Sequence, residues 1–237
     1  MNKFLPLVID LDGSLTYVDT LYESTLKLLI KHPIDVFRLP LWLYQGKATL
    51  KNRIAQKIEF NPETVPYNQE LLEYLKEQKQ RGRKLILCTA ADSTIANKIA
   101  DHLGIFDEVM ASDGTTNLSS GQKAKALGSR FGLKGFDYVG NSTDDLAVWP
   151  SSNKAIIVNA SPSLIKKAKT ISDVEKVFPA PKQDISTWLR VFRIHQWVKN
   201  ILLFMPLIAA HQLLNTALWL QLIIAFFAFS LCASSVY

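Results

Sequence analysis

Short apolar runs and longer helical periods alternate along the first 170 residues of the chain. The apolar runs are bounded by turn residues and predict strands at residues 5–11, 84–89, 108–111, 136–140 and 155–158. Amphipathic helices are predicted between them, with Gly82 and Gly104 ending two of these helices. This alternation predicts an α/β fold, a doubly wound, Rossmann-like parallel sheet with helices on both faces.

Residues 20 to about 80 interrupt the alternation, because three helical stretches follow one another with no strand between them. Roughly 60 residues is long for a single crossover between parallel strands. We therefore expect a helical cap insertion, at about residues 18–80, lying over the edge of the sheet. A pair of ordinary connecting helices is the alternative.

The pattern changes again near residue 175. Pro179 and Pro181 make residues 175–184 a stiff linker. Residues 185–197 combine apolar positions at helical spacing with Arg190 and Arg193, which is typical of a helix at a membrane interface. A helix packed on the preceding domain is the alternative.

Two apolar stretches follow, residues 201–214 and 216–237, and predict a transmembrane helical hairpin. The second is long enough to span a bilayer, whereas the first carries Pro206 and spans only with its flanks. Arg190, Arg193 and Lys199 precede the first span, so the positive-inside rule puts the N-terminal domain in the cytoplasm. We also expect the chain to be a piece of a longer membrane protein.

Composition adds two exclusions. Of the 27 Lys and Arg residues three lie in residues 185–237, which leaves 24 against 21 Asp and Glu in the rest, so the charge gives no indication of a nucleic-acid partner. Two distant cysteines, Cys88 and Cys232, provide neither a disulfide framework nor a metal-binding pair.

The stretch VIDLDGSLT places Asp10 and Asp12 at the end of the first predicted strand. Alternate residues of a strand point to the same face, so the two carboxylates converge if the strand continues there. They would repel each other unless a cation lies nearby, and Mg²⁺ prefers such oxygen ligands. Gly13 would allow a ligand close to the backbone, and Ser14 offers a hydroxyl. An ordinary turn at Asp12 and Gly13 is the bland alternative.

Three other polar features occupy corresponding places: Thr89 ends the second strand, Lys123 begins a helix, and GNSTDDL (140–146) follows a later strand. In a doubly wound sheet these strand ends share one edge, where ligands bind. A carboxylate nucleophile, a metal, a hydroxyl and an ammonium group together suit phosphoryl transfer. Taken alone, Thr89 could cap the next helix, and Lys123, like Lys125, could be a solvated helix position.

In this order the motifs resemble the haloacid dehalogenase (HAD) superfamily of phosphatases, in particular its phosphoserine-phosphatase-like members with a helical cap. DLDGSL is similar to the first motif, and GNSTDD is similar to the fourth, GDxxxD. The resemblance covers residues 5 to about 170. A response-regulator receiver domain fits less well, because the paired acids open the chain and no isolated Asp follows the second strand.

The resemblance implies that Asp10 is the nucleophile and Asp12 the general acid and then base. It implies that Ser14, Thr89 and Lys123 bind the phosphoryl group. The metal ligands would come from four residues: Asp10, Asp12, Asn141 and Asp145. Asn141 stands where the family has an acid, so the site has one negative charge fewer, for which Asp144 could partly substitute.

The segment RVFRIHQWVKNILLF (190–204) resembles the start of UbiA-type prenyltransferases, in the decaprenyl-phosphate phosphoribosyltransferase-like branch. Arg193, Lys199 and Asn200 match that pattern, as do Gln196 and Trp197; Ile194 replaces a proline. Without the aspartate-rich motif of that family, residues 1–237 should not transfer a prenyl group. Interfacial anchoring by Arg193 and Lys199 is the alternative role.

We therefore expect a phosphatase domain at residues 1–174, a linker at 175–184, and the beginning of a membrane transferase at 185–237. The predicted activity is Mg²⁺-dependent hydrolysis of a phosphorylated small molecule or prenyl-linked substrate, in contact with membrane lipid at the bacterial inner membrane. Two other hypotheses are a non-catalytic, regulatory HAD domain and a protein whose main activity is prenyl transfer.

Overall fold

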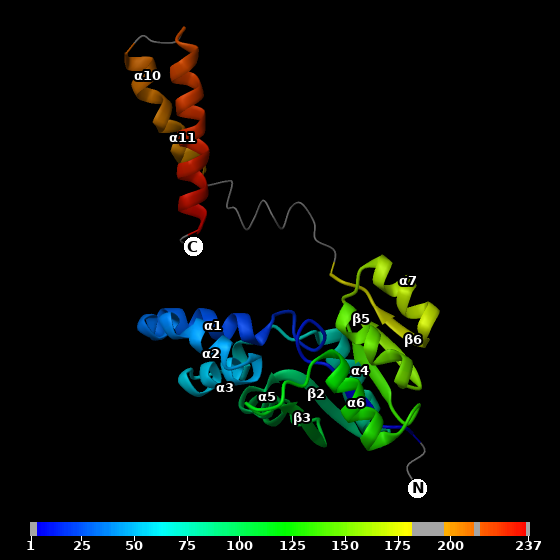
Figure 1. Cartoon of the computed structure of the whole chain (residues 1–237). Coiled ribbons are helices and arrows are strands. Elements are labelled where there is room, and N and C mark those ends of the chain that lie inside the picture. The colour runs from blue at the N-terminus through cyan, green and yellow to red at the C-terminus, as the bar shows by residue number, and fades with distance from the viewer. Residues whose placement is uncertain (1–3, 182–196, 211–213, 236–237) are drawn as a thin grey trace. The chain divides into compact units, whose positions relative to one another are not determined.

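The computed structural model describes residues 4–181, 197–210 and 214–235. The chain folds as two compact units, Met1–Ala180 and Pro181–Tyr237. The first unit is built around a parallel sheet, drawn in Figure 1, and the described elements of the second are apolar helices.

Six parallel strands form the sheet, in the order β3-β2-β1-β4-β5-β6. Their bounds are β1 Leu7–Ile9, β2 Leu85–Asp92, β3 Glu108–Ser112, β4 Asp137–Gly140, β5 Lys154–Val158 and β6 Asp173–Phe178. The chain builds outward from β1 to β3, then returns to place β4 on the other side of β1. The strand order reverses between β1 and β4, which is the point where α/β sheets open a crevice for ligands.

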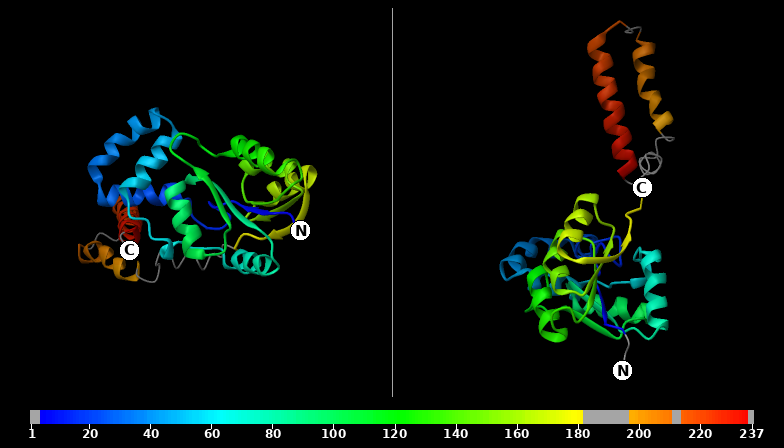
Figure 2. Two further views of the ribbon diagram at one scale, coloured as in Figure 1. Left: turned by 90° about the horizontal axis from the view of Figure 1, so that it is seen from below. Right: turned by 90° about the vertical axis from the view of Figure 1, so that its right-hand side faces the viewer.

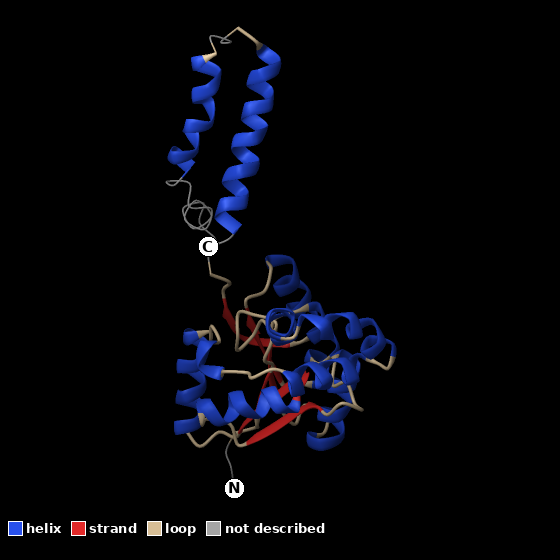
Figure 3. Ribbon diagram, turned by 90° about the vertical axis from the view of Figure 1, so that its left-hand side faces the viewer, coloured by secondary structure: helices blue, strands red, loops and turns tan. Residues whose placement is uncertain are grey.

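Alternate residues of the strands bury into two cores, one on each face of the sheet. Leu7 and Ile9 of β1 join the core covered by α4 and α5, while Val8 joins the opposite core, covered by α6 and α7. The helices of this α/β layer are α4 Gln69–Gln80, α5 Ser93–Leu103, α6 Ser120–Phe131 and α7 Pro162–Ile171. The predicted doubly wound sheet is confirmed, with helices on both faces (Figures 1 and 3).

The helices that precede α4 in the segment between β1 and β2 lie beside the sheet, as the views in Figures 1 and 2 agree. Before α4 this segment contains α1 Thr20–Lys31, η1 Pro33–Arg38, α2 Leu39–Tyr44, α3 Lys47–Lys57 and η2 Pro62–Thr64. Asp19 caps α1 by accepting hydrogen bonds from two backbone amides, and Gly46, at φ 122°, provides the left-handed step between α2 and α3. We call α1, η1, α2 and α3 the insertion.

The predicted linker at 175–184 is wrong at its beginning, because residues 175–178 belong to β6. This edge strand mixes three charged residues with three apolar ones, so its sequence DVEKVF lacks the apolar run of the other strands. Its last residue, Phe178, is nevertheless buried in the core against Tyr74.

In the C-terminal unit the described elements are η5 Val198–Phe204, α10 Met205–Ala209 and α11 Thr216–Ser235. One described helix, Thr216–Ser234, is long and apolar enough to cross a membrane. The prediction of two spanning helices is therefore wrong for the described residues: the first apolar stretch is a 3-10 segment that gives way to a short helix with Pro206 in its first turn. The predicted interfacial helix, Arg193 included, lies outside the described residues apart from Trp197.

Contacts within this unit join the two apolar segments. The Asn200 side-chain amide donates to the Ser230 hydroxyl, 2.8 Å away, and the indole of Trp197 donates to the hydroxyl of Ser234 at 3.2 Å. Phe204 packs on Trp219, near the other end of α11. The two segments are thus antiparallel, and Asn200 has a packing role in this unit.

Candidate active site

Asp10 lies directly beyond β1, and its backbone amide continues the sheet by donating to the carbonyl of Val139 at 3.0 Å. The side chain is 8% exposed and forms an ion pair with Lys123 from the first turns of α6, with Nζ 2.6 Å from Oδ1. The Oδ2 atom of Asp10 accepts no hydrogen bond from the described residues. Burial raises the pKa of Asp10 to about 7, although Lys123 opposes this shift.

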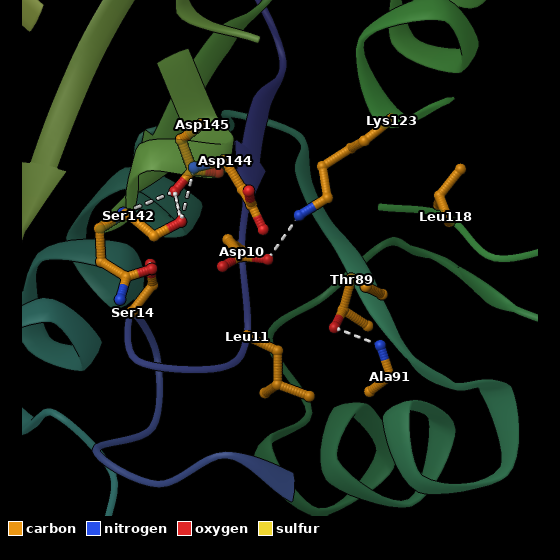
Figure 4. A network of polar contacts seen from close by, with 12 residues as sticks. Asp10, Leu11, Ser14, Thr89, Ala91, Leu118, Lys123, Ser142, Asp144 and Asp145 are labelled. Carbon is orange, nitrogen blue, oxygen red and sulfur yellow. Dashed lines mark hydrogen bonds and ion pairs between the residues drawn. The ribbon is translucent and has the colours of Figure 1, made fainter. Parts of the chain in front are cut away.

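Tyr138 connects this ion pair, which is drawn in Figure 4, to Asp145. Lys123 Nζ donates to the Tyr138 hydroxyl at 3.1 Å, and that hydroxyl donates to Asp145 Oδ1 at 2.7 Å. Burial would lower the pKa of Lys123, but the nearby Asp10, Cys88 thiol and Asp145 outweigh it and the pKa is raised. Lys123 is thus held as a cation in a buried position.

Asp145 is fully engaged at Oδ2, which accepts hydrogen bonds from the backbone amides of Asn141 and Ser142, both at 2.9 Å. The bond from Ser142 is one half of the capping box of a short 3-10 helix, Thr143–Ala147, whose N-cap is Ser142. The carboxylate therefore shapes the loop after β4 and faces Lys123 through Tyr138. It is a poorer candidate for direct metal ligation than the sequence indicated.

Asp12 sits at the other side of the loop after β1. Its Oδ1 accepts a hydrogen bond from the backbone amide of Thr20, 2.8 Å away, at the first residue of α1. Burial raises the pKa of Asp12, and this hydrogen bond partly offsets the rise. Asp12 therefore joins the nucleophile loop to the start of the insertion.

Asn141 packs against this same loop. A Cβ atom at Gly13, which has φ 76°, would lie 2.1 Å from Asn141 Nδ2, so only glycine leaves room for the amide. Asn141 Oδ1 accepts a hydrogen bond from the hydroxyl of Ser14 at 3.2 Å. Ser14, fully buried, thus orients Asn141.

Thr89 is also fully buried, and its hydroxyl accepts a hydrogen bond from the backbone amide of Ala91 at 3.0 Å (Figure 4). It does not line the cavity described below, whereas its neighbours Ala90 and Ala91 do. Thr89 does not cap the next helix, because Asp92 is the N-cap of α5 and Thr89 lies within β2. Its phosphoryl contact stays a prediction.

A cavity of about 680 Å³ opens at the carboxyl ends of β1, β2 and β4. Four predicted residues line it together: Asp10, Asp12, Lys123 and Asp145. Its far wall comes from the insertion, with side chains that the sequence did not single out. Among them Ser24 carries a buried hydroxyl with no hydrogen-bond partner in the described part of the chain.

Lys51 of α3 is the principal cation of that wall. Its Nζ donates to the carbonyl of Ala90 at 2.6 Å and to Asn117 Oδ1 at 3.2 Å, so the insertion is fastened to the end of β2. Burial lowers the pKa of Lys51, and the nearby Asp12 and Asp19 oppose this. Its sequence context, a lysine-rich polar helix, gave no sign of this position.

The residues present fit Mg²⁺ in part. The unbonded Oδ2 of Asp10, together with Asp12 and the Asn141 side-chain oxygen, offers the hard oxygen donors that this ion prefers. Among the described residues, however, no group of three or more His, Cys, Asp and Glu side chains is arranged to hold a metal. A divalent cation at this site would depend on one carboxylate, that of Asp10, together with the backbone carbonyl of Asp12 and the amide of Asn141.

The fold of the first unit is that of the HAD-superfamily phosphatases. A substrate-bound phosphoserine phosphatase is 18% identical with a TM-score of 0.52, covering 80% of this chain and 99% of that one. An apo phosphoserine phosphatase is 17% identical with a TM-score of 0.51, and the match covers 79% of this chain and 98% of that one. A HAD family hydrolase, t0658 from Salmonella enterica serovar Typhi, is 13% identical with a TM-score of 0.50, and the match covers 69% of this chain and 66% of that one.

One curated relative resembles the whole chain. It is "Uncharacterized protein y4nM" of Sinorhizobium fredii (strain NBRC 101917 / NGR234), 34% identical over 238 residues. The alignment covers 100% of this chain and 46% of that protein, so the chain spans about half the length of the curated relative it matches. No family model matches the chain.

Proposed function

We propose that the first unit is a phosphomonoester hydrolase that acts through an aspartyl-phosphate at Asp10. One observation carries the proposal: a buried carboxylate with a free oxygen and an ammonium partner lines the same cavity as a second carboxylate, Asp12. The buried Lys123 holds Asp10 in place and favours its ionised form. The HAD-type fold agrees with this chemistry.

In the proposed first step, Asp10 Oδ2 attacks phosphorus while the bond from phosphorus to the alcohol oxygen breaks. Asp12, protonated, gives its proton to that leaving oxygen, and the raised pKa of Asp12 favours the protonated form. In the second step Asp12 takes a proton from water, the water oxygen attacks phosphorus, and the bond from phosphorus to Asp10 breaks. Phosphate leaves, and both carboxyl groups return to their first state.

Mg²⁺, held by the Asp10 carboxylate, the backbone carbonyl of Asp12 and the Asn141 side-chain oxygen, would neutralise the charge of the transferring phosphoryl group. Lys123 would support the same charge through its contact with Asp10. Asp145 and Tyr138 would keep Lys123 oriented, because they form the polar side of its pocket.

The test is hydrolysis of an aryl phosphate by the full chain in lipid nanodiscs with Mg²⁺. We expect Asp10→Asn to lower kcat/KM by at least about a thousandfold, since the nucleophile is lost. The exposed Asp101→Asn is the control and should retain activity. Label from a ³²P-phosphomonoester should appear on the wild type and not on Asp10→Asn. A wild-type protein that hydrolyses none of a broad panel of phosphate monoesters would contradict the proposal.

A second candidate function is a non-catalytic HAD domain that serves a membrane transferase, and Asn141 favours it. Because the site lacks one acid, a titration in which Mg²⁺ does not bind would support this candidate. The UbiA-type reading rests on residues 193–200, and of its three candidate residues Lys199 and Asn200 lie in η5. Prenyl transfer assayed with the complete gene product would test it.

We further propose that α11 anchors the chain in a membrane, with the first unit in the cytoplasm. The length and apolar composition of Thr216–Ser234 support this. Lys199, before the apolar stretch, agrees with a cytoplasmic start.

A further inference from the structure

An apolar groove of about 290 Å³ crosses the insertion between α1, α2 and α3. Its lining is aliphatic except for Thr25, whose hydroxyl already donates to the carbonyl of Leu21 at 2.8 Å. Ile54, almost fully buried, belongs both to this lining and to the core. The groove offers no free hydrogen-bonding side chain, so its occupant must be apolar.

The groove continues into the candidate active site. Leu21, Leu43 and Leu50 line both the groove and the cavity that contains Asp10 and Lys123. Each of these three leucines comes from a different helix, so α1, α2 and α3 all contribute to the junction. A ligand with its phosphate at Asp10 therefore has an apolar path leading away from it along the insertion.

We infer that the groove receives the apolar chain of the substrate, which is a phosphate monoester of a long-chain alkyl or isoprenoid alcohol. This inference rests on the proposed function, because it assigns the phosphate end of the same molecule to Asp10. A bound chain would also cover Leu43, which is 51% exposed although it lies at the junction. Covering such exposed aliphatic surface is a source of binding free energy.

A substrate chain fits the groove better than a second copy of the protein does. The groove is small, of the size that holds part of a small ligand, and it shares three leucines with the cavity that contains the catalytic carboxylates. A second copy of the protein, packed on the insertion, would bury the outer faces of its helices without reaching this junction. A chain attached to the reacting phosphate reaches it necessarily.

Chain-length dependence tests the inference with and without catalysis. The full chain in lipid nanodiscs is titrated with ethylphosphonate and octylphosphonate, which are not hydrolysed, and empty nanodiscs correct for partitioning. Each buried CH₂ group contributes about fourfold, so we expect octylphosphonate to bind at least tenfold more tightly. With ethyl and octyl phosphate as substrates, kcat/KM should show the same preference.

Two groove variants should remove the preference: Thr25→Phe, which fills the groove, and Leu39→Gln, which makes its lining polar. Leu41→Gln is the matched control, since Leu41 is on the same helix, is 58% exposed and does not line the groove. Circular dichroism checks that each variant folds. If Leu39→Gln does not fold, Thr25→Phe carries the test, because it keeps the lining of the groove apolar.

A preference below tenfold, or one that both folded groove variants keep, overturns the inference. So does a dimer that Leu39→Gln dissociates and Leu41→Gln does not, because the occupant would then be a second copy. Chain-length-dependent phosphonate binding without hydrolysis of either ester would support the groove and refute the proposed function. Hydrolysis of both esters at equal rates would do the reverse.

Discussion

At the scale of single residues, Asp12 carries a carboxylate whose pKa is raised by burial above its ordinary value of 3.8. The folded state thus disfavours ionisation, and wild-type stability falls as the pH rises from that value through the folded pKa. Asp12→Asn removes this loss, and its side-chain oxygen can still accept from Thr20. We expect the variant to unfold at higher urea than wild type at about pH 8, with the difference vanishing toward about pH 4.

The same substitution should abolish the proposed acid and base role, lowering kcat by about 10²–10⁴-fold. Urea titrations in EDTA across this pH range measure the stability part. A variant whose advantage were constant with pH, or larger at acidic pH, would contradict the raised pKa.

Asn141 sets how firmly a cation is held. Asn141→Asp adds a negative charge close to Asp10, so without metal we expect a lower melting temperature through repulsion. With Mg²⁺ the added charge attracts the ion, and we expect binding about tenfold or more tighter. Calorimetric titration of Mg²⁺ measures the affinity, with Asn117→Asp as the control, because Asn117 lines the cavity but belongs to a different loop from Asn141. Equal Mg²⁺ affinities in wild type and Asn141→Asp would refute the assignment of Asn141.

The sequence could predict that Asp10, Asp12, Lys123 and Asp145 meet, because the ends of parallel strands share one edge of the sheet. It could not predict Tyr138, since this residue occupies an alternating position of β4 that is indistinguishable from core. The position of Lys51 in the cavity wall could not be predicted either. It depends on how α3 packs against the end of β2, and the neighbouring lysines have the same sequence context.

At the scale of elements, Arg83 joins neighbouring strands at their amino-terminal ends, which are the ends opposite to the candidate active site. It lies just before β2 and pairs with the buried Asp137 at the start of β4, and its Nε donates to the carbonyl of Leu5 at 2.9 Å. Asp137 also accepts from the backbone amide of Lys154, at 2.9 Å, at the start of β5. One ion pair thus fixes the register of the central strands.

Arg83→Met should therefore lower the free energy of unfolding by about 3–5 kcal/mol, because it leaves a buried carboxylate without its cation. Arg81→Met is the matched control, since Arg81 is exposed and its contact with Glu77 is 4.0 Å. We expect the control to cost less than about 0.5 kcal/mol. Urea unfolding of both variants decides this, and equal costs would show that the pair does not carry the register.

The element pattern was predictable where burial is two-sided and ambiguous elsewhere. Strands β1 to β5 contain apolar runs, whereas β6 lies at the edge and half of its residues are charged, so its sequence was indistinguishable from a linker. The helical insertion was predictable from its length, but the groove within it depends on how α1, α2 and α3 pack. No periodicity within one helix encodes that packing.

At the scale of the whole molecule, α11 decides whether the chain is a membrane protein. In the apolar stretch Thr216–Ser234 only 6% of the most apolar 18-residue window is buried, and it carries no formal charge. In water such a surface would be costly, whereas a bilayer would cover it. The proposed membrane anchor follows from this exposure.

Two lysines at the centre of α11, Ile223→Lys with Ile224→Lys, should prevent insertion, because each costs about 2.5–3.5 kcal/mol there. The matched control places the same charges at the end of the helix, with Thr216→Lys and Ala217→Lys, where long side chains reach the interface. We expect alkaline carbonate to release the central variant from membranes and to leave the wild type and the control in the pellet. A central variant that stays in the pellet would mean that α11 does not span the bilayer, and that its apolar surface is covered by protein instead.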